Sequence, residues 1–143
     1  MATQNDDRKW TVAAAAGEGW AKHVFPDLKS SEEQVDALWD QIFKVCRIYE
    51  DDPVAAWDKH KEALKKKAAV LNEHQFDVLH FKAPGTDFTL GLPKNHIWAS
   101  AESYDPNGVE FIANMPTEEV FTAPDTRRMD GVVRSTTPLS YEG

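Results

Sequence analysis

The apolar residues between positions 35 and 46 recur every three or four places, and this spacing constrains the chain more than any other feature. Residues at that spacing share one face of an α-helix. They are Val35, Leu38, Trp39, Ile42, Phe43 and Cys46. Just before them, Ser30 and Glu33 have the spacing of a capping box, in which each side chain satisfies a backbone N–H. The sequence therefore predicts an amphipathic helix that begins near residue 31 and ends between Tyr49 and Asp52.

A second helix is predicted directly after the first. Asp52 can cap a helix, and Pro53 suits the first helical position, where no N–H is needed. The apolar residues that keep helical spacing after it are Val54, Trp57, Leu64, Ala68 and Leu71. Because the link between the two helices is so short, we expect them to pack as a helical hairpin.

The pattern changes near Asn72, beyond which short strand-like runs alternate with turns. The strand candidates are residues 76–82, 88–92, 96–100, 109–113, 120–122 and 131–135. A turn is expected at 84–86, and Asn107-Gly108 is the strongest short hairpin signal. We therefore expect an α+β fold, in which the helical hairpin precedes a mostly antiparallel, incomplete β region with open edges. We place a domain boundary near residue 75, between 1–75 and 76–143.

Charge and hydropathy exclude several classes of partner. The chain has 143 residues and a net charge of −8, and its one run of basic residues, 65–67, lies inside the second predicted helix. Nucleic acids and anionic membranes both call for clustered Lys and Arg, so neither is an expected partner. No stretch reaches the ~18 apolar residues of a membrane span, and residues 1–9 lack the apolar core of a signal peptide.

Cys46 is the only cysteine of the chain. No internal disulfide can therefore form, which fits a reducing compartment and favours a cytoplasmic location. The residue falls on the apolar face of the first predicted helix, where we interpret it as a small buried hydrophobe.

One stretch could carry chemistry, although the familiar phosphate-loop, zinc and nucleophile motifs are absent. Between Pro116 and Pro124, two adjacent carboxylates, Glu118 and Glu119, come just before apolar residues. On an extended chain they point to opposite faces, so one could line a cleft while the other faces solvent. A carboxylate at a strand edge suits a hard or borderline metal ion, and an acidic surface turn would have the same pattern.

That stretch resembles the first metal-binding segment of the aminopeptidase T / aminopeptidase S (PepS) family of two-metal aminopeptidases. The similar phrase is Asn-Met-Pro-Thr-Glu-Glu-Val-Phe-Thr-Ala-Pro, at 114–124. Other similar stretches lie, in order, at 20–22, 24–26, 52–57, 71–72, 84–87, 91–93, 96–98 and 138–141. The resemblance covers nearly the whole chain from about Trp10, which makes it far more specific than one short motif.

The resemblance implies a cytoplasmic metalloprotease that hydrolyses N-terminal residues from peptides and is a homodimer when full length. It also implies two divalent metal ions, zinc, cobalt or manganese, in a C-terminal domain that follows an α/β N-terminal domain. Carried over by position, one metal ligand falls on Glu119, with Glu118 as the less favoured alternative. The family's other ligands, a further Glu, two His and an Asp, belong to segments with no match in this chain, and no catalytic residue is assigned.

The resemblance further implies an internal fragment, in which the end of the N-terminal domain joins the start of the metal domain. Because a catalytic zinc needs about three protein ligands, we expect the isolated fragment to hold no metal stably and to be inactive. One alternative is a non-catalytic truncated form that acts as an interaction module through its exposed strand edges. Another is a self-contained metal-binding domain that uses His80, Asp87 and His96.

Overall fold

The computed structural model describes residues 9–137, which form two compact units. The first unit consists of the chain up to Lys66 together with Ser100–Val120. The second consists of Lys67–Ala99 together with the chain from Phe121 onward. Each unit has its own strands and its own buried residues. The stretch at 138–141, which contributes to the family resemblance, lies outside the described residues.

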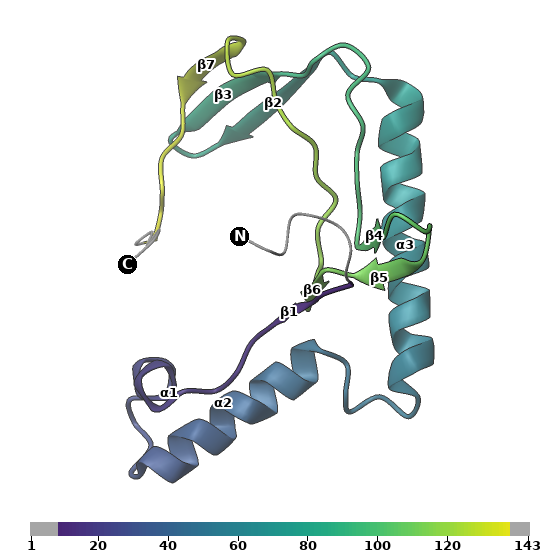
Figure 1. Ribbon diagram of the computed structural model, residues 1–143. Coiled ribbons are helices and arrows are strands. Elements are labelled where there is room, and N and C mark those ends of the chain that lie inside the picture. The colour runs from purple at the N-terminus through teal and green to yellow at the C-terminus, as the bar shows by residue number, and fades with distance from the viewer. Residues whose placement is uncertain (1–8, 138–143) are drawn as a thin grey trace. The chain divides into compact units, whose positions relative to one another are not determined.

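Two helices near the N-terminus form the core of the first unit. Helix α1 (Glu18–Val24) packs beside helix α2 (Ser31–Val45) (Figure 1). The predicted capping box is present, because Ser30 Oγ accepts from the Glu33 N–H at 3.1 Å and Glu33 Oε2 accepts from the Ser30 N–H at 3.2 Å. The buried residues of this core are Ala21, Leu38, Ile42 and Cys46. The apolar face predicted for α2 is therefore covered by α1.

Helix α3 (Pro53–His74) begins as predicted, with the Ala55 N–H donating to Asp52 Oδ1 at 3.0 Å. Its first turns are fixed to the end of α2, because Trp57 Nε1–H donates to the Cys46 carbonyl at 2.8 Å. The link between the two helices, residues 46–52, is longer than expected, because α2 ends at Val45 and not between Tyr49 and Asp52. The two helices meet near this junction and do not pack along their lengths, so the predicted helical hairpin does not form (Figure 1). The apolar face of α2 packs against α1 instead.

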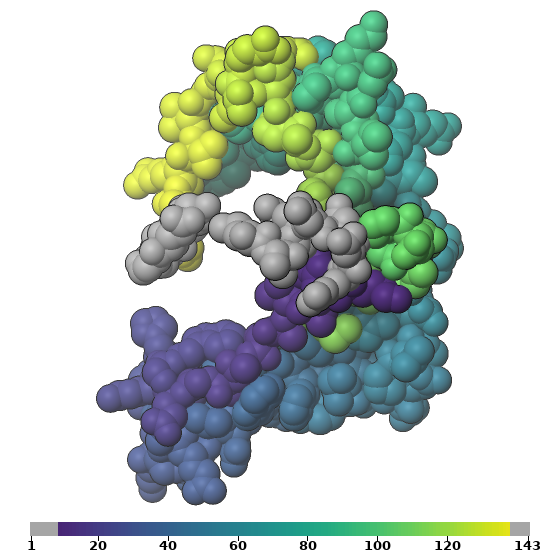
Figure 2. Space-filling model, in the orientation of Figure 1, coloured from purple at the N-terminus to yellow at the C-terminus, as the bar shows by residue number. Residues whose placement is uncertain are grey.

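The first unit also contains two pairs of short strands. Strand β1 (Val12–Ala13) pairs in parallel with β6 (Asn114–Met115). Strand β4 (Glu102–Tyr104) pairs antiparallel with β5 (Glu110–Ile112). In the space-filling view β1, in dark purple, lies at the surface of this unit, in agreement with its exposed side chains (Figure 2).

The turn between β4 and β5 is organised by Asp105. Its Oδ1 accepts the N–H groups of Asn107 and Val109 at 2.9 and 2.8 Å. Gly108 adopts a φ of 77°, in the left-handed region that glycine enters without steric cost. The Asn107-Gly108 signal thus predicted this hairpin correctly.

The second unit contains a three-stranded antiparallel sheet. Its strands are β2 (Val78–Ala83), β3 (Thr86–Gly91) and β7 (Met129–Val132), in the order β2-β3-β7. The predicted turn between β2 and β3 is present, with Gly85 at a φ of 77°. The strand candidates at 76–82, 88–92 and 131–135 are therefore confirmed, with shifts of a few residues.

The strand predicted at 96–100 is wrong, and a side chain explains why. Asn72 accepts the Trp98 N–H at 2.8 Å and donates to the Trp98 carbonyl at 2.9 Å. The backbone of Trp98 is satisfied by this amide instead of by a neighbouring strand. Only one isolated bridge, between Ala99 and Phe121, remains in the segments that were predicted as strands at 96–100 and 120–122.

The α+β class is confirmed by three helices and several small sheets of mixed orientation within residues 9–137. The parallel pair β1–β6 is the one departure from the expected antiparallel pairing. The assignment of 1–75 and 76–143 to two domains of a longer enzyme stays a prediction. In the described part of the chain, no helix has the length and apolar character that a membrane crossing requires.

Candidate functional site

The two adjacent carboxylates lie just beyond strand β6, in the first unit. After β6 the chain passes through the cis peptide bond between Met115 and Pro116. Residues 116–119 and the β1 segment 12–14 then line an open hollow of about 560 Å³. Both glutamates therefore follow strand β6 and border a concave surface. The sequence pattern alone had placed them just before a strand.

Glu118 is held by two side chains from the helical part of the unit. Arg47 Nη2 lies 2.8 Å from Glu118 Oε1, and His60 Nε2 lies 3.4 Å from Glu118 Oε2. The Glu118 side chain is 60% exposed, so the ion pair with Arg47 contributes at most about 1 kcal/mol to stability. Its larger consequence is geometric, because it fixes the direction in which Glu118 points.

The same two residues also hold the backbone beside Glu118. His60 Nε2 lies 2.7 Å from the Thr117 carbonyl oxygen, while His60 Nδ1 lies 3.1 Å from Arg47 Nη2. Thr117 is buried, at 7% exposure. We refer to Arg47 and His60 together as the Arg47–His60 clamp. It binds the chain at Thr117 and Glu118, the two residues immediately before Glu119.

Glu119 takes no part in the clamp. Its side chain is exposed, and no partner for its carboxylate is found among residues 9–137. Both glutamates border the same hollow, and they differ in that Glu118 has protein partners. Of the two sequence-predicted ligands, the structure thus engages Glu118 with protein groups and leaves Glu119 available to a ligand.

The chemistry of these donors fits one metal ligand at the edge of a site. No group of three or more His, Cys, Asp or Glu suited to a metal ion occurs in the described part of the chain. The positive charge of Arg47 beside Glu118 Oε1 makes Glu118 a weaker donor to a second cation. A divalent ion could accept Glu119 as a carboxylate ligand, and its remaining ligands would have to come from outside residues 9–137.

The self-contained metal site considered from the sequence does not form. His80 Nε2 bonds Asp87 Oδ1 at 2.7 Å across β2 and β3, and this bond holds the pKa of Asp87 below its ordinary value. His96 instead directs Nδ1 at the Pro93 carbonyl, at 3.0 Å, with its ring buried. Since His80, Asp87 and His96 form no cluster in residues 9–137, the hypothesis that they bind a metal is wrong.

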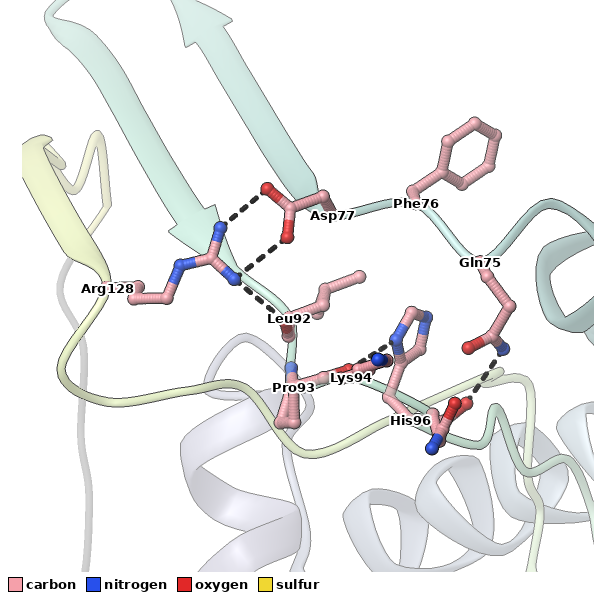
Figure 3. Close-up of a pocket in the computed structure, with 9 residues that line it drawn as sticks. Gln75, Phe76, Asp77, Leu92, Pro93, Lys94, His96 and Arg128 are labelled. Atoms are coloured by element: carbon pink, nitrogen blue, oxygen red, sulfur yellow. Dashed lines mark hydrogen bonds and ion pairs between the residues drawn. The ribbon is translucent and has the colours of Figure 1, made fainter.

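A second hollow, of about 370 Å³, lies within the second unit beside His96 (Figure 3). On its wall Arg128 makes two contacts with the carboxylate of Asp77, at 2.9 and 2.6 Å, and a third with the Leu92 carbonyl at 3.0 Å. The Arg128 hydrogen bonds hold the pKa of Asp77 below its ordinary value. Because this carboxylate is already paired, the second hollow offers no acidic ligand to a metal ion.

The family model described as thermophilic metalloprotease (M29) matches residues 1–143. The chain belongs to the M29 family. It is 62% identical over its whole length to aminopeptidase PepS of Streptococcus thermophilus, and 53% identical over 98% of its length to aminopeptidase AmpS of Bacillus subtilis. These matches cover 35% and 34% of the two proteins, so the M29 chain spans about a third of the length of these curated relatives.

A solved structure of the same family has the same backbone course. Wild-type AmpT from Thermus thermophilus superposes with a TM-score of 0.82, at 45% sequence identity, over 91% of this M29 chain and 31% of that chain. The family expected from residues 114–124 is therefore confirmed, together with the α+β class.

Sequence reasoning did not find Arg47 or His60. Arg47 follows the end of a helix and His60 lies on the next one, and neither belongs to a motif that points to residues 117–119. The bond from His60 to Thr117 joins residues 57 positions apart. No local sequence signal could have revealed it.

Proposed function

We propose that the protein carrying this chain is a metal-dependent aminopeptidase, and that Glu119 is one of its metal ligands. The family and the names of the relatives, aminopeptidases PepS, AmpS and T, support the activity. The observation that carries the role of Glu119 is the difference between the partners of the two carboxylates. Glu118 is paired with Arg47, whereas Glu119 is exposed beside a hollow with no partner among residues 9–137.

Two divalent ions, zinc, cobalt or manganese, would supply a water of lowered pKa and would stabilise the oxyanion of the peptide bond under attack. This chain's contribution is the Glu119 carboxylate, which adds negative charge and one oxygen donor to such a site. The further ligands, and the general base, would come from outside the described residues. Peptides with a free N-terminus are the proposed substrates, and neither a nucleic acid nor a membrane is a proposed partner.

The test compares Glu119→Gln with Glu118→Gln in the full-length protein. Glutamine preserves the size of each side chain and removes its charge, so folding should persist in both variants. We expect Glu119→Gln to lose bound metal and hydrolysis of aminoacyl substrates by more than about 100-fold, because even outer-shell partners are worth 10–100-fold in metal affinity. Glu118→Gln can still accept from Arg47 and should retain most of its metal.

Two outcomes would contradict this assignment. Unchanged metal content and activity in Glu119→Gln would remove that residue from the site. Loss of metal in Glu118→Gln alone would assign the ligand to Glu118. For the isolated 143-residue chain we expect no turnover with added cobalt or zinc, and robust hydrolysis would disprove the need for further ligands.

The competing proposal is a non-catalytic form that acts as an interaction module. One observation favours it: several large apolar side chains of the second unit's sheet are exposed. They are Val78, Phe81, Met129 and Val132. Co-purification of the 143-residue chain with a full-length subunit, with no metal in the complex beyond that of the subunit, would support this function.

We further propose that the full-length protein acts in the cytoplasm as a homodimer. The single cysteine of this chain, which is buried, supports the location, and the family resemblance supports the dimer. Cell fractionation and light scattering of the purified protein test the two statements separately.

A further inference from the structure

We propose that Arg47 and His60 are positioning residues for the metal site: they hold residues 117 and 118 so that the Glu119 carboxylate is directed at the metal before the metal binds. This inference rests on the proposed function, in which Glu119 is a metal ligand. It assigns a role to two residues that make no contact with Glu119 themselves.

The first step is the placement of Arg47. Helix α2 ends at Val45, and Arg47 follows with a φ of 60°, a left-handed conformation that is uncommon for residues other than glycine. This turn places the guanidinium 5.0 Å from the centre of the Trp57 ring. Trp57 is itself 7% exposed and fixed by its hydrogen bond to the Cys46 carbonyl. The cation therefore rests on a rigid aromatic surface.

The second step is the protonation pattern of His60. Arg47 is always a donor, so the contact between Arg47 Nη2 and His60 Nδ1, at 3.1 Å, requires Nδ1 to accept. The ring proton then lies on Nε2, which donates to the Thr117 carbonyl at 2.7 Å. This tautomer is inferred from the hydrogen-bond partners. Arg47 thus sets the tautomer with which His60 holds the backbone of Thr117.

The third step concerns the direction of Glu119. The Thr117 carbonyl is bonded to His60 and the Glu118 carboxylate is bonded to Arg47, so the two residues before Glu119 are both held. The backbone position from which the Glu119 side chain leaves the chain, beside the hollow, is thereby restricted. A ligand whose direction is already set loses less conformational entropy when the metal binds, and second-shell contacts act in this way.

Other contacts hold the surrounding structure, so a positioning role can be separated from a structural one. Lys61, next to His60 on α3, pairs with Glu110 of β5 at 2.9 Å and makes no hydrogen bond or ion pair with residues 117–119. Removing the Lys61 charge weakens the packing of the same helix without touching the clamp. Lys61→Met is therefore the matched control for Arg47→Met and His60→Phe.

The experiment uses the full-length protein after removal of its metal. The affinity for Zn²⁺ is measured by competition with a chelator, and amide hydrogen exchange is followed over residues 116–120 of the metal-free protein. We expect Arg47→Met and His60→Phe each to weaken Zn²⁺ binding by about 10–100-fold and to speed exchange in that segment. Lys61→Met should leave both readouts unchanged. Arg47→Lys should bind Zn²⁺ more tightly than Arg47→Met but less tightly than wild type. Lysine can pair with Glu118, but it cannot bond Glu118 and His60 together in the fixed geometry of arginine.

The inference would be overturned if both clamp variants, Arg47→Met and His60→Phe, kept the Zn²⁺ affinity of the wild type. It would also be overturned if Lys61→Met lowered the Zn²⁺ affinity as much as they do. If one clamp variant does not fold, the other still decides. Glu119→Gln measured alongside separates the two proposals. Loss of Zn²⁺ in Glu119→Gln with full affinity in the clamp variants overturns only the positioning role, while full affinity in Glu119→Gln overturns the proposed ligand and this inference with it.

Discussion

Lys61 Nζ lies 2.9 Å from Glu110 Oε1 and joins helix α3 to strand β5 across 49 positions of the chain. Lys65, one helical turn further on, reaches Glu110 Oε2 at 3.2 Å. One carboxylate therefore ties two cations of α3 to the β4–β5 hairpin. The Glu110 side chain is 31% exposed, so it is partly shielded from solvent.

Replacing Glu110 by Gln should lower stability in a pH-dependent way. Hydrogen bonds from Lys61 and then Lys65 hold the pKa of Glu110 below its ordinary value of 4.5. A carboxyl group whose pKa is lowered by folding stabilises the protein above its unfolded pKa, and this stabilisation is lost as the pH falls through the folded value. We expect a loss of about 0.5–1 kcal/mol at neutral pH, measured as local unfolding by hydrogen exchange.

The difference in the free energy of unfolding between wild type and Glu110→Gln should be constant from neutral pH down to about pH 5.5 and should shrink below pH 4.5. Glu62→Gln, which makes the same charge change on α3, serves as the control. A difference that does not change between neutral and acid pH would show that Glu110 stabilises the hairpin by packing alone.

Gly131→Ala should weaken the β3–β7 pairing more than Gly108→Ala weakens its own turn. Both glycines have positive φ, 118° and 77°. A Cβ at 131 would overlap the Asp87 carbonyl oxygen and lie 2.9 Å from Phe88 Cα, whereas a Cβ at 108 meets nothing within 4 Å. We expect the free energy of local unfolding to fall by more than about 2 kcal/mol for Gly131→Ala and by about 1 kcal/mol for Gly108→Ala.

Hydrogen exchange of the β3 and β7 amides measures the first of these costs, and exchange of the β4–β5 amides measures the second. Equal costs at the two positions would mean that the backbone of β3 moves aside for the new methyl group.

Ser30→Ala should destabilise the start of α2 by about 1 kcal/mol, because it removes the oxygen that accepts the Glu33 N–H. Ser31→Ala, one residue later in the first turn of the helix, removes no capping bond and should be neutral or slightly stabilising. Exchange rates of the first-turn amides report both effects. Similar behaviour of the two variants would argue that water replaces the Ser30 cap without loss.

Cys46 should react slowly with alkylating reagents while α2 is folded. The residue is 6% exposed, and burial raises the pKa of its thiol, which lowers the fraction of reactive thiolate. We expect labelling at pH 8, followed by mass spectrometry of the peptide that contains Cys46, to need local unfolding and to accelerate with denaturant. Fast labelling of the native protein would contradict the burial of this thiol.

Local signals explain why helices α2 and α3 and the β4–β5 hairpin could be predicted, whereas α1 was missed. Ser30 and Glu33 satisfy N–H groups within one helical turn, and Asp52 does the same for α3, so each start depends only on its neighbours in sequence. The Asn107-Gly108 turn depends in the same way on Asp105, a few residues away. The apolar spacing of α2 identified its buried face, but not the helix that covers it.

The family resemblance of residues 114–124 also singled out Glu118 and Glu119, which border the hollow beside β1. The sequence could not reveal the clamp, since Arg47 and His60 reach residues 117 and 118 from a different part of the chain. Nor could it reveal that Asn72 satisfies the backbone of Trp98, which removed a predicted strand. These contacts depend on side chains that meet only after the helices and strands have packed.

By itself, the amino-acid sequence determined where helices α2 and α3 begin, where the hairpin turns and which family the chain belongs to, because capping, turn formation and motif similarity act over a few residues. Only the tertiary structure decided which glutamate is engaged by protein and which is left exposed. That choice follows from hydrogen bonds between residues as far as 57 positions apart, whose geometry no local pattern specifies.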